Sequence, residues 1–293
     1  MEKLSIENLN EIIEAAGLPT HEALKTLWEK EKNKLLNSHN VLYHYTDTNA
    51  LLNGIITDKQ NDDERICLWA TDWSCLNDKA ERETGLEYFR MILNGNEPVI
   101  KLHEDNTKNN KIICFSTRKD YLPMWSMYGK NGSGVMLEFD LKKLENNYGY
   151  RLLPCAYVDT NFDKKLREKI RNCELGASIE NLNINIRQLV LLRIAVCYVC
   201  VRKNCNFNYE NEVRLYGFGN KIFGDNEREE FHRTNNGFKI PYSKIYFSKD
   251  ILKKVWLGPN QDMDLSMESL RRFLDSKGLE NVEVKTSNIP YRG

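Results

Sequence analysis

The chain has 293 residues, of which 41% are hydrophobic and 29% are charged, a balance that is ordinary for a globular protein. An aromatic content of 10% argues against disorder, because disordered chains lack the apolar side chains that offset the entropy cost of ordering. Lysine plus arginine and aspartate plus glutamate each number 42, so the formal charge is zero. A neutral chain has no overall field that attracts nucleic acid or an anionic membrane, and only a local basic patch could bind either.

The N-terminal residues and the cysteines indicate the compartment. The chain opens MEKLSIENLNEIIE, without the apolar segment of a signal peptide, and its most apolar stretch, Leu189–Val201, is shorter than the ~18 residues that span a bilayer. We therefore expect a cytoplasmic protein whose eight cysteines are reduced thiols. Cys197 and Cys200 lie at helical spacing, and no second ligand pair follows at zinc-like spacing, so the sequence predicts neither a disulfide nor a metal site.

Residues 1–40 predict two helices that form an N-terminal extension. Ser5 can cap the first helix and Thr20 the second, whose apolar stripe includes Trp28 and Leu35. No Gly- or Pro-rich linker follows. We therefore predict one domain over residues 41–293, with the extension packed at its edge.

From Val41 onward the chain contains short runs rich in β-branched and aromatic residues, which are typical of strands. The predicted strands are VLYHYT, ICLWAT, KIICFST, GVMLEFD, EVRLYGF, KVWLG and VEVKTS. Helical patterns fall between some of them, at residues 77–92, 123–128, 162–173 and 178–200. Because this alternation is irregular, the sequence predicts an α+β fold rather than a doubly wound parallel sheet.

The first candidate site segment is the end of VLYHYT. Alternation along a strand places His44 and Thr46 on one face and Tyr43 and Tyr45 on the other. A neutral histidine in this position can hold a ribose hydroxyl. The alternative is a core histidine bonded to a backbone carbonyl.

Two further segments carry polar and aromatic side chains. Asn77 or Asp78 can cap the predicted helix that starts there. Ser116 ends a predicted strand, and Trp125 and Tyr128, three residues apart, share one face of a short helix. Aromatic side chains beside a strand end can clamp a flat ring, or they can simply pack the helix onto the sheet.

The fourth segment is Tyr209–Arg214. If it is a strand, Glu210, Glu212 and Arg214 project from one face. They form either a solvent-facing charge ladder or a cleft in which a carboxylate stabilises a developing positive charge. No phosphate-binding loop, zinc-protease motif or nucleophile elbow accompanies these segments.

In this order, the four segments resemble an uncharacterised bacterial family, domain of unknown function 2971. The resemblance rests on an aromatic-His-Tyr-Thr strand, an Asn-Asp-x-x-Glu helix start, a Cys-Phe-Ser strand followed by Trp-x-x-Tyr, a Gly-Val strand, and Glu-x-Glu-x-Arg. It covers about residues 41–293. The family name states no function.

A second resemblance does suggest a function. The order of a histidine, aromatic side chains and a late glutamate is similar to the His-Tyr-Glu arrangement of ADP-ribosyltransferases, which implies a mixed-sheet core of that type with flanking helices. It implies NAD as substrate, His44 on a ribose, Glu212 as the stabiliser of a cationic sugar, and no metal. The aromatic residues that compete for the nicotinamide are Trp69, Phe115, Trp125 and Tyr128. The implied binding residues are Tyr45, Thr46, Trp69, Asn77, Asp78, Ser116, Trp125, Tyr128, Glu210 and Arg214.

Three functions follow as hypotheses. The first is NAD-dependent ADP-ribosyl transfer or NAD hydrolysis, in an antiphage or toxin role, with a macromolecular or small-molecule acceptor or water. It requires that His44 and Glu212 line one cleft and that they do not lie on opposite sides of the sheet. The second is a non-catalytic nucleotide- or ligand-sensing domain on the same fold. The third is nucleic-acid binding through the basic residues between 164 and 171, which is disfavoured because Asp163 and Glu168 interrupt them.

Overall fold

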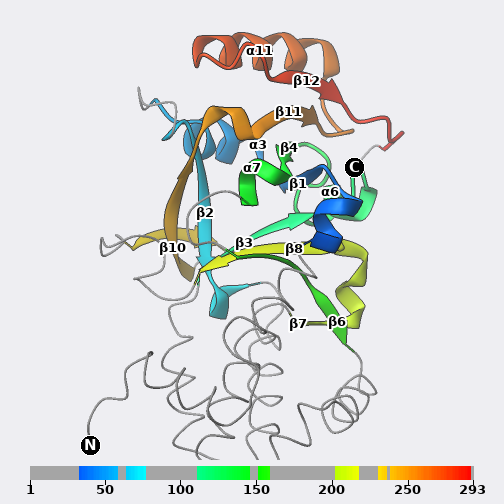
Figure 1. Ribbon diagram of the computed structural model, residues 1–293. Coiled ribbons are helices and arrows are strands. Elements are labelled where there is room, and N and C mark those ends of the chain that lie inside the picture. The colour runs from blue at the N-terminus through cyan, green and yellow to red at the C-terminus, as the bar shows by residue number, and fades with distance from the viewer. Residues whose placement is uncertain are drawn as a thin grey trace, which may run out of the picture.

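A computed structural model describes residues 33–58, 64–76, 111–145, 151–158, 202–217, 230–235 and 238–291 (Figure 1). Most of the predicted N-terminal extension lies outside these residues, as do the helices predicted over 77–92, 162–173 and 178–200. The extension and the single domain over 41–293 therefore stay predictions. Leu35, from the predicted apolar stripe, is described and is buried in the main core.

Strands dominate the described part of the chain. Ten of its strands form one mixed sheet: β1 (Val41–Thr46), β2 (Ile66–Asp72), β3 (Lys111–Ser116), β4 (Val135–Asp140), β5 (Arg151–Pro154), β8 (Glu212–Gly217), β9 (Phe231–Asn235), β10 (Phe238–Phe247), β11 (Leu252–Leu257) and β12 (Glu283–Thr286). A separate parallel pair is formed by β6 (Ala156–Val158) and β7 (Arg202–Asn204). The predicted α+β class is confirmed.

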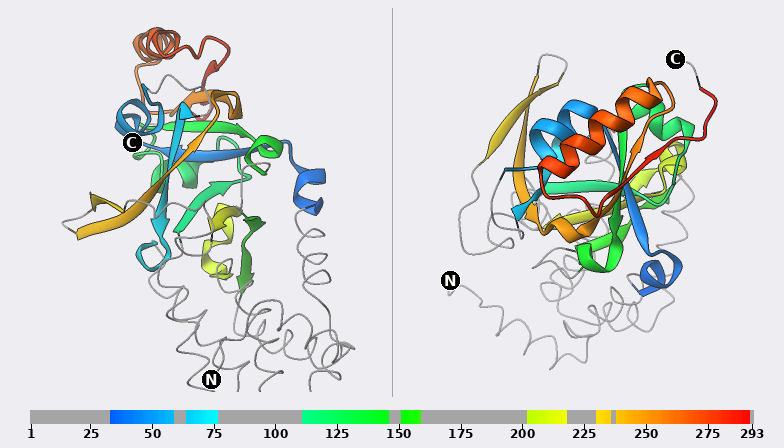
Figure 2. Two further views of the ribbon diagram at one scale, coloured as in Figure 1. Left: turned by 60° about the vertical axis from the view of Figure 1, so that its left-hand side comes forward. Right: turned by 90° about the horizontal axis from the view of Figure 1, so that it is seen from above.

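The helices are few and mostly short. Residues 33–38 are helical, and the further helices are α3 (Thr48–Ala50), α6 (Leu122–Met127), α7 (Leu141–Glu145) and α11 (Met263–Ser276), with 3-10 turns at Trp73–Cys75, Cys205–Glu210 and Lys249–Ile251 and a π-helical turn at Leu51–Ile55. The longest, α11, connects the parallel strands β11 and β12 and lies across them at one end of the sheet (Figures 1 and 2). Asp262 caps it by accepting a hydrogen bond from the amide of Leu265.

The order of strands in the large sheet is β12-β11-β4-β1-β3-β2-β10-β9, and β8 pairs with both β3 and β5. The β11–β12 pair is parallel, and the other pairs of this sheet are antiparallel. The β9–β10 hairpin forms one end of this order (Figure 2).

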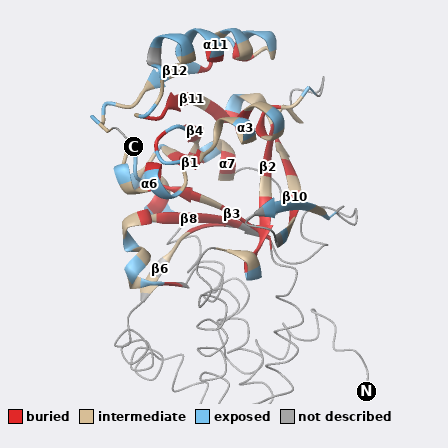
Figure 3. Ribbon diagram, turned by 180° about the vertical axis from the view of Figure 1, so that it is seen from behind, coloured by how far each residue is buried: buried red, intermediate tan, exposed pale blue. Residues whose placement is uncertain are grey.

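Two apolar clusters flank the strands. Alternation along β1 sends Leu42 into the larger cluster, with Phe115, Val213 and other aliphatic side chains. It sends Tyr43 and Tyr45 into a smaller cluster under α6. Figure 3 shows the resulting pattern, in which the central strands are buried and the outer face of α11 is exposed.

The sheet opens beside β3. Strand β8 pairs with β3 along its whole length, from Lys111 to Ser116, and so occupies one edge. On the other edge, β1 pairs only at Ser116 and β2 only at Lys111 and Ile112. Strands β1 and β2 therefore diverge at the middle of β3. This opening between them positions the candidate site.

All seven predicted strands are present, within one or two residues of their predicted ends. The helix predicted over 123–128 is α6. The sequence analysis did not predict the β9–β10 hairpin, the short strands β5, β6 and β7, or α11.

Candidate functional site

A cavity of about 590 Å³ occupies the opening between β1 and β2, with β3 between them. This volume lies within the range of small-molecule sites. Side chains from β1, β2, β3, α6, β8 and β9 line it. Of the residues proposed from the sequence, those that line it are His44, Tyr45, Thr46, Trp69, Phe115, Ser116, Tyr128, Glu210, Glu212 and Arg214.

The local backbone differs from the prediction at Glu210. Cys205–Glu210 is a 3-10 helix, Asn211 adopts a left-handed conformation with φ 42°, and the strand starts only at Glu212. Strand alternation therefore does not place Glu210 beside Glu212. The left-handed residue turns the chain instead, and asparagine tolerates that conformation better than most residues do.

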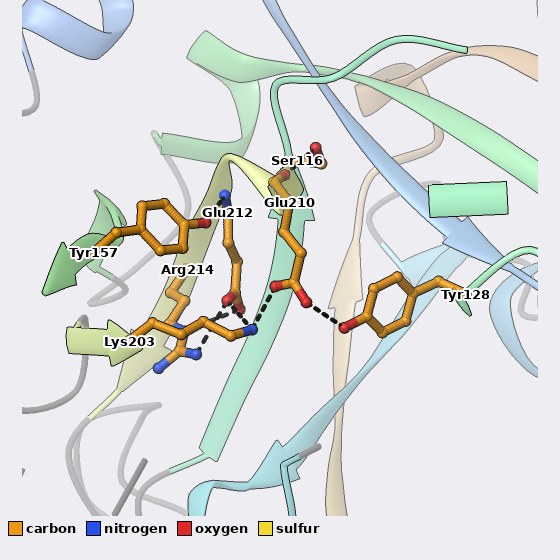
Figure 4. A network of polar contacts seen from close by, with 7 residues as sticks. All are labelled: Ser116, Tyr128, Tyr157, Lys203, Glu210, Glu212 and Arg214. Atoms are coloured by element: carbon orange, nitrogen blue, oxygen red, sulfur yellow. Dashed lines mark hydrogen bonds and ion pairs between the residues drawn. The ribbon is translucent and has the colours of Figure 1, made fainter. Parts of the chain in front are cut away.

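Both glutamates belong to a buried ion network (Figure 4). Lys203 Nζ donates to Glu210 Oε2 and, at 2.8 Å, to Glu212 Oε2. Arg214 Nε donates to Glu212 Oε1 at 2.9 Å, and its Nη2 donates to Oε2 at 3.1 Å. Tyr128 donates its hydroxyl hydrogen to Glu210 Oε1 at 2.6 Å. All four charged side chains are at most 6% exposed, so the interpretation as a solvent-facing charge ladder is wrong.

The network sets the protonation of its members. Burial by itself would raise the pKa of Glu212, but Arg214 and Lys203 outweigh burial and hold this pKa well below its usual value. Burial raises the pKa of Glu210 despite the opposing effect of Lys203. Burial would lower the pKa of Lys203, but the two carboxylates raise it. At neutral pH Glu212 is thus a buried anion beside two cations.

Hydroxyl groups hold the backbone of this segment. Ser116 Oγ donates to the Glu210 carbonyl oxygen at 2.5 Å, and the Glu212 amide donates to the Tyr157 hydroxyl at 2.7 Å. Ser116 therefore serves the site by fixing the turn that carries the glutamates.

Burial, followed by the nearby charge of Glu212, raises the pKa of the Cys114 thiol well above its usual value, so this thiol is protonated at neutral pH.

The His44 side chain lies at the point where β1 no longer pairs with β3. Its Nδ1 lies 2.8 Å from the carbonyl oxygen of Cys114, and because a carbonyl can only accept, Nδ1 carries the hydrogen. Burial is the main cause that lowers the pKa of His44, so the ring is neutral and Nε2 holds a lone pair. This contact is the one predicted for a core histidine bonded to a backbone carbonyl. The His44 ring nevertheless also lines the cavity.

His44 and Glu212 line the same cavity but come from opposite faces of the sheet. Glu212 pairs with Ser116, whereas His44 lies on the face of Phe115, with ring centroids 6.0 Å apart. The cavity reaches both because β1 and β2 have separated between them. The expectation of a shared cleft is therefore met, and the expectation that both side chains lie on one side of the sheet is contradicted.

The aromatic candidates divide into packing and lining residues. Trp125 is fully buried, donates Nε1 to Asp120 at 2.8 Å and packs edge-on against Tyr45, with centroids 5.0 Å apart. It does not line the cavity, which corrects the expectation that it shares the wall with Tyr128. Tyr45 is also anchored, because its hydroxyl donates to the Arg118 carbonyl at 2.8 Å.

Trp69 lies on the β2 side of the cavity. Its ring stacks on Tyr242, with centroids 4.8 Å apart, and packs so closely on Gly54 that a Cβ there would lie 2.4 Å from the ring. Tyr242 therefore occupies one face of the Trp69 ring.

Two predicted residues, Asn77 and Asp78, lie outside the described residues, as do Cys197 and Cys200. Within the described ranges, no group of three or more His, Cys, Asp or Glu side chains could hold a metal ion, and no described cysteine forms a disulfide. None of the helices in these ranges is both long and apolar enough to cross a membrane.

Sequence reasoning missed Lys203 and Arg233, which both line the cavity. Lys203 lies on the short strand β7, which pairs with β6 about 45 residues away, and no local pattern predicts that pairing. Arg233 lies on β9, whose hairpin partner carries Pro241, a residue that disfavours a strand prediction.

Comparison with known families gives one match. The family described as "Protein of unknown function (DUF2971)" matches residues 124–215. This confirms the resemblance over the matched segment, which includes Tyr128, Lys203, Glu210, Glu212 and Arg214. No match was found among curated proteins or among solved structures.

Proposed function

We propose that the cavity binds NAD and that the chain cleaves the bond between nicotinamide and ribose, transferring ADP-ribose to an acceptor or to water. The supporting observation is that an ionised glutamate and a neutral histidine line one cavity from its two sides. The proposal includes the finer fold expectation, an ADP-ribosyltransferase-like arrangement of the mixed sheet.

The reaction suits this set of residues. When the glycosidic bond breaks, its electron pair leaves with the nicotinamide nitrogen, and positive charge grows on the sugar. The acceptor then forms a bond to the same carbon and loses a proton. A carboxylate that already carries its charge can stabilise this state. His44 Nε2 can accept a hydrogen bond from a ribose hydroxyl and orient the sugar.

The ion network sets a condition on this mechanism. Both oxygens of Glu212 already accept hydrogen bonds, from Arg214 and Lys203. Two carboxylates facing two cations leave no surplus negative charge for a sugar cation. Lys203 therefore has to release Glu212 Oε2 when the substrate binds. In the proposed reaction, Lys203 then stays paired with Glu210 alone.

Glu212→Gln tests the catalytic step. The variant keeps the shape of the side chain but removes its charge, so turnover should fall on the order of 10²-fold or more while NAD binding is retained. The measurement is nicotinamide release from NAD, with labelled NAD and cell lysate to detect modified macromolecules. Glu280→Gln, at an exposed position, is the control and should keep full activity. Unchanged turnover in Glu212→Gln would contradict the assignment.

A second candidate is a nucleotide-sensing domain without catalysis. Two observations favour it: both oxygens of Glu212 already accept hydrogen bonds from cationic side chains, and His44 and Glu212 come from opposite faces of the sheet. In this case the wild-type protein binds NAD in calorimetry but releases no nicotinamide, whatever lysate is added.

A further inference from the structure

The charges around the cavity are unequally compensated. The described residues place three cationic side chains on its wall, Lys203, Arg214 and Arg233. Lys203 and Arg214 are buried and held by carboxylates. Arg233 is exposed, and no carboxylate of the described residues lies within ion-pair distance of it. It is therefore the cation at the mouth of the cavity that an incoming ligand can reach.

Arg233 is held in place by uncharged groups. Its Nη2 donates to the hydroxyl of Thr71 at 3.1 Å, and its guanidinium lies 6.0 Å from the centre of the Trp69 ring. Both partners belong to β2, so Arg233 reaches from β9 across β10 to the cavity. Such contacts orient a guanidinium but leave its charge uncompensated.

A stack of aromatic rings fixes this geometry. Trp69 stacks on Tyr242, and Tyr242 stacks on Phe231, with centroids 4.8 Å and 5.7 Å apart. These rings come from β2, β10 and β9, so they tie the edge hairpin to the strand that lines the cavity. Since Arg233 is two residues from Phe231, it lies on the same face of β9 as this stack.

The cavity also carries an acid near this end. Asp47 lines it, but one of its oxygens caps α3 by accepting from the Ala50 amide at 2.7 Å. Asp47 forms no ion pair with Arg233, although its charge attracts this guanidinium from a distance. An anion that enters the cavity thus meets Arg233 before any other available cation of the described residues.

We propose that Arg233 and Thr71 form a phosphate subsite at the mouth of the cavity, which takes the phosphate groups of a nucleotide. The planar guanidinium can donate two parallel hydrogen bonds to phosphate oxygens, and the Thr71 hydroxyl, which accepts from Arg233, keeps its own hydrogen to donate. This inference rests on the proposed function in requiring that the cavity holds a nucleotide. It places the phosphate contact at Arg233 and not at Arg214, one of the binding residues expected from the sequence, because Arg214 is fully buried against Glu212.

Arg233→Gln tests the subsite by calorimetry with matched ligands. Affinity for NAD, ADP-ribose and ADP should fall roughly tenfold to a hundredfold, the scale of a lost charge-assisted hydrogen bond. Affinity for nicotinamide riboside and adenosine, which lack phosphate, should not change. Raising the salt concentration should weaken NAD binding more in the wild type than in the variant.

Lys244→Gln is the matched control. Lys244 lies on the same face of the hairpin, with its Nζ 4.1 Å from the centre of the Phe231 ring, but it does not line the cavity. Removing its charge should leave all five affinities unchanged. Arg233→Lys keeps the charge without the planar fork and should recover only part of the lost affinity.

The outcomes separate the two proposals. If the wild type binds ADP through Arg233 but does not bind NAD, the phosphate subsite stands and the proposed function fails. If NAD is bound and cleaved equally well by wild type and Arg233→Gln, the proposed function stands and the subsite is overturned. Equal losses for NAD and nicotinamide riboside would also overturn it, because the effect would not depend on phosphate.

Discussion

At the scale of single residues, the site depends on the sharing of Lys203 between two glutamates. Its ammonium contacts both carboxylates, and its side chain is 6% exposed. Removing one member of a buried ion pair leaves an uncompensated charge, which costs far more than a surface pair contributes. Lys203 therefore determines both the stability of the turn at Asn211 and the charge that a substrate encounters.

Lys203→Met should lower the free energy of unfolding by about 3–5 kcal/mol at neutral pH. It should also move acid unfolding to higher pH. The pKa of Glu212 is depressed from its ordinary value of 4.5 in the folded state, so its contribution to stability is complete above that value and is lost as the pH falls toward the folded pKa. Without Lys203 the folded pKa rises and the loss begins at a higher pH.

Chemical denaturation followed between pH 3 and pH 8 measures both effects. Arg272→Met is the control, since Arg272 pairs with Glu268 on the exposed face of α11 and its removal should change little. Equal stability of Lys203→Met and the wild type over this range would show that the ion network contributes nothing to the fold.

At the scale of elements, β3 and the turn after α6 shape the site. Strand β3 pairs with β1, β2 and β8. Between the residues that pair with β1 and those that pair with β2, His44 Nδ1 donates to the Cys114 carbonyl oxygen. The turn that follows α6 has positive φ at Lys130, Asn131 and Gly132, and it directs the chain into β4 beside β1. Gly134 ends this turn against the backbone of β1. A Cβ at Gly134 would lie 2.3 Å from the Thr46 carbonyl oxygen.

Gly134→Ala should therefore destabilise the protein by about 1–3 kcal/mol, because backbone atoms on both sides cannot move aside as a flexible side chain could. The measurement is the midpoint of thermal unfolding. Ser133→Ala, at the exposed neighbouring position, should leave the midpoint nearly unchanged. A normal midpoint for Gly134→Ala would mean that β1 and β4 separate here without cost.

At the scale of the whole molecule, Asp120 joins the end of the chain to α6. It accepts hydrogen bonds from Trp125 Nε1 at 2.8 Å, Ser287 Oγ at 2.6 Å and the Asn288 amide at 2.9 Å. The C-terminal segment thereby lies beside the helix that carries Tyr128 to the site (Figure 1). Segments about 165 residues apart are held together by one carboxylate.

Asp120→Asn should loosen this connection. Asparagine tolerates the positive φ at this position but has one acceptor oxygen in place of two, so its amide group would face a donor. The tail should then separate more often, and trypsin should cleave after Lys285 faster than in the wild type. Glu280→Gln serves again as the control, and an unchanged cleavage rate in Asp120→Asn would exclude the anchoring role.

Sequence alone determined much of the scaffold. Local patterns identify strands and their faces, since alternation of side chains and β-branched composition depend on neighbouring residues only. The seven predicted strands followed from such patterns, as did the placement of His44 on one face of β1 and of Tyr43 and Tyr45 on the other. Over residues 124–215, the order of motifs also agrees with the match to the DUF2971 family model.

Tertiary structure decided which of these side chains meet. The ion network depends on Lys203 from a strand pair with no local signature, and on a left-handed Asn211 that alternation does not predict. The cavity exists because β1 and β2 share one edge of β3 and diverge, a consequence of pairing between distant segments. Trp125 and Tyr128 show what spacing alone does not decide, because it is compatible with core packing and with a place in the cavity wall. Contacts with Tyr45 and Asp120 bury Trp125, whereas Tyr128 lies at the cavity and donates to Glu210.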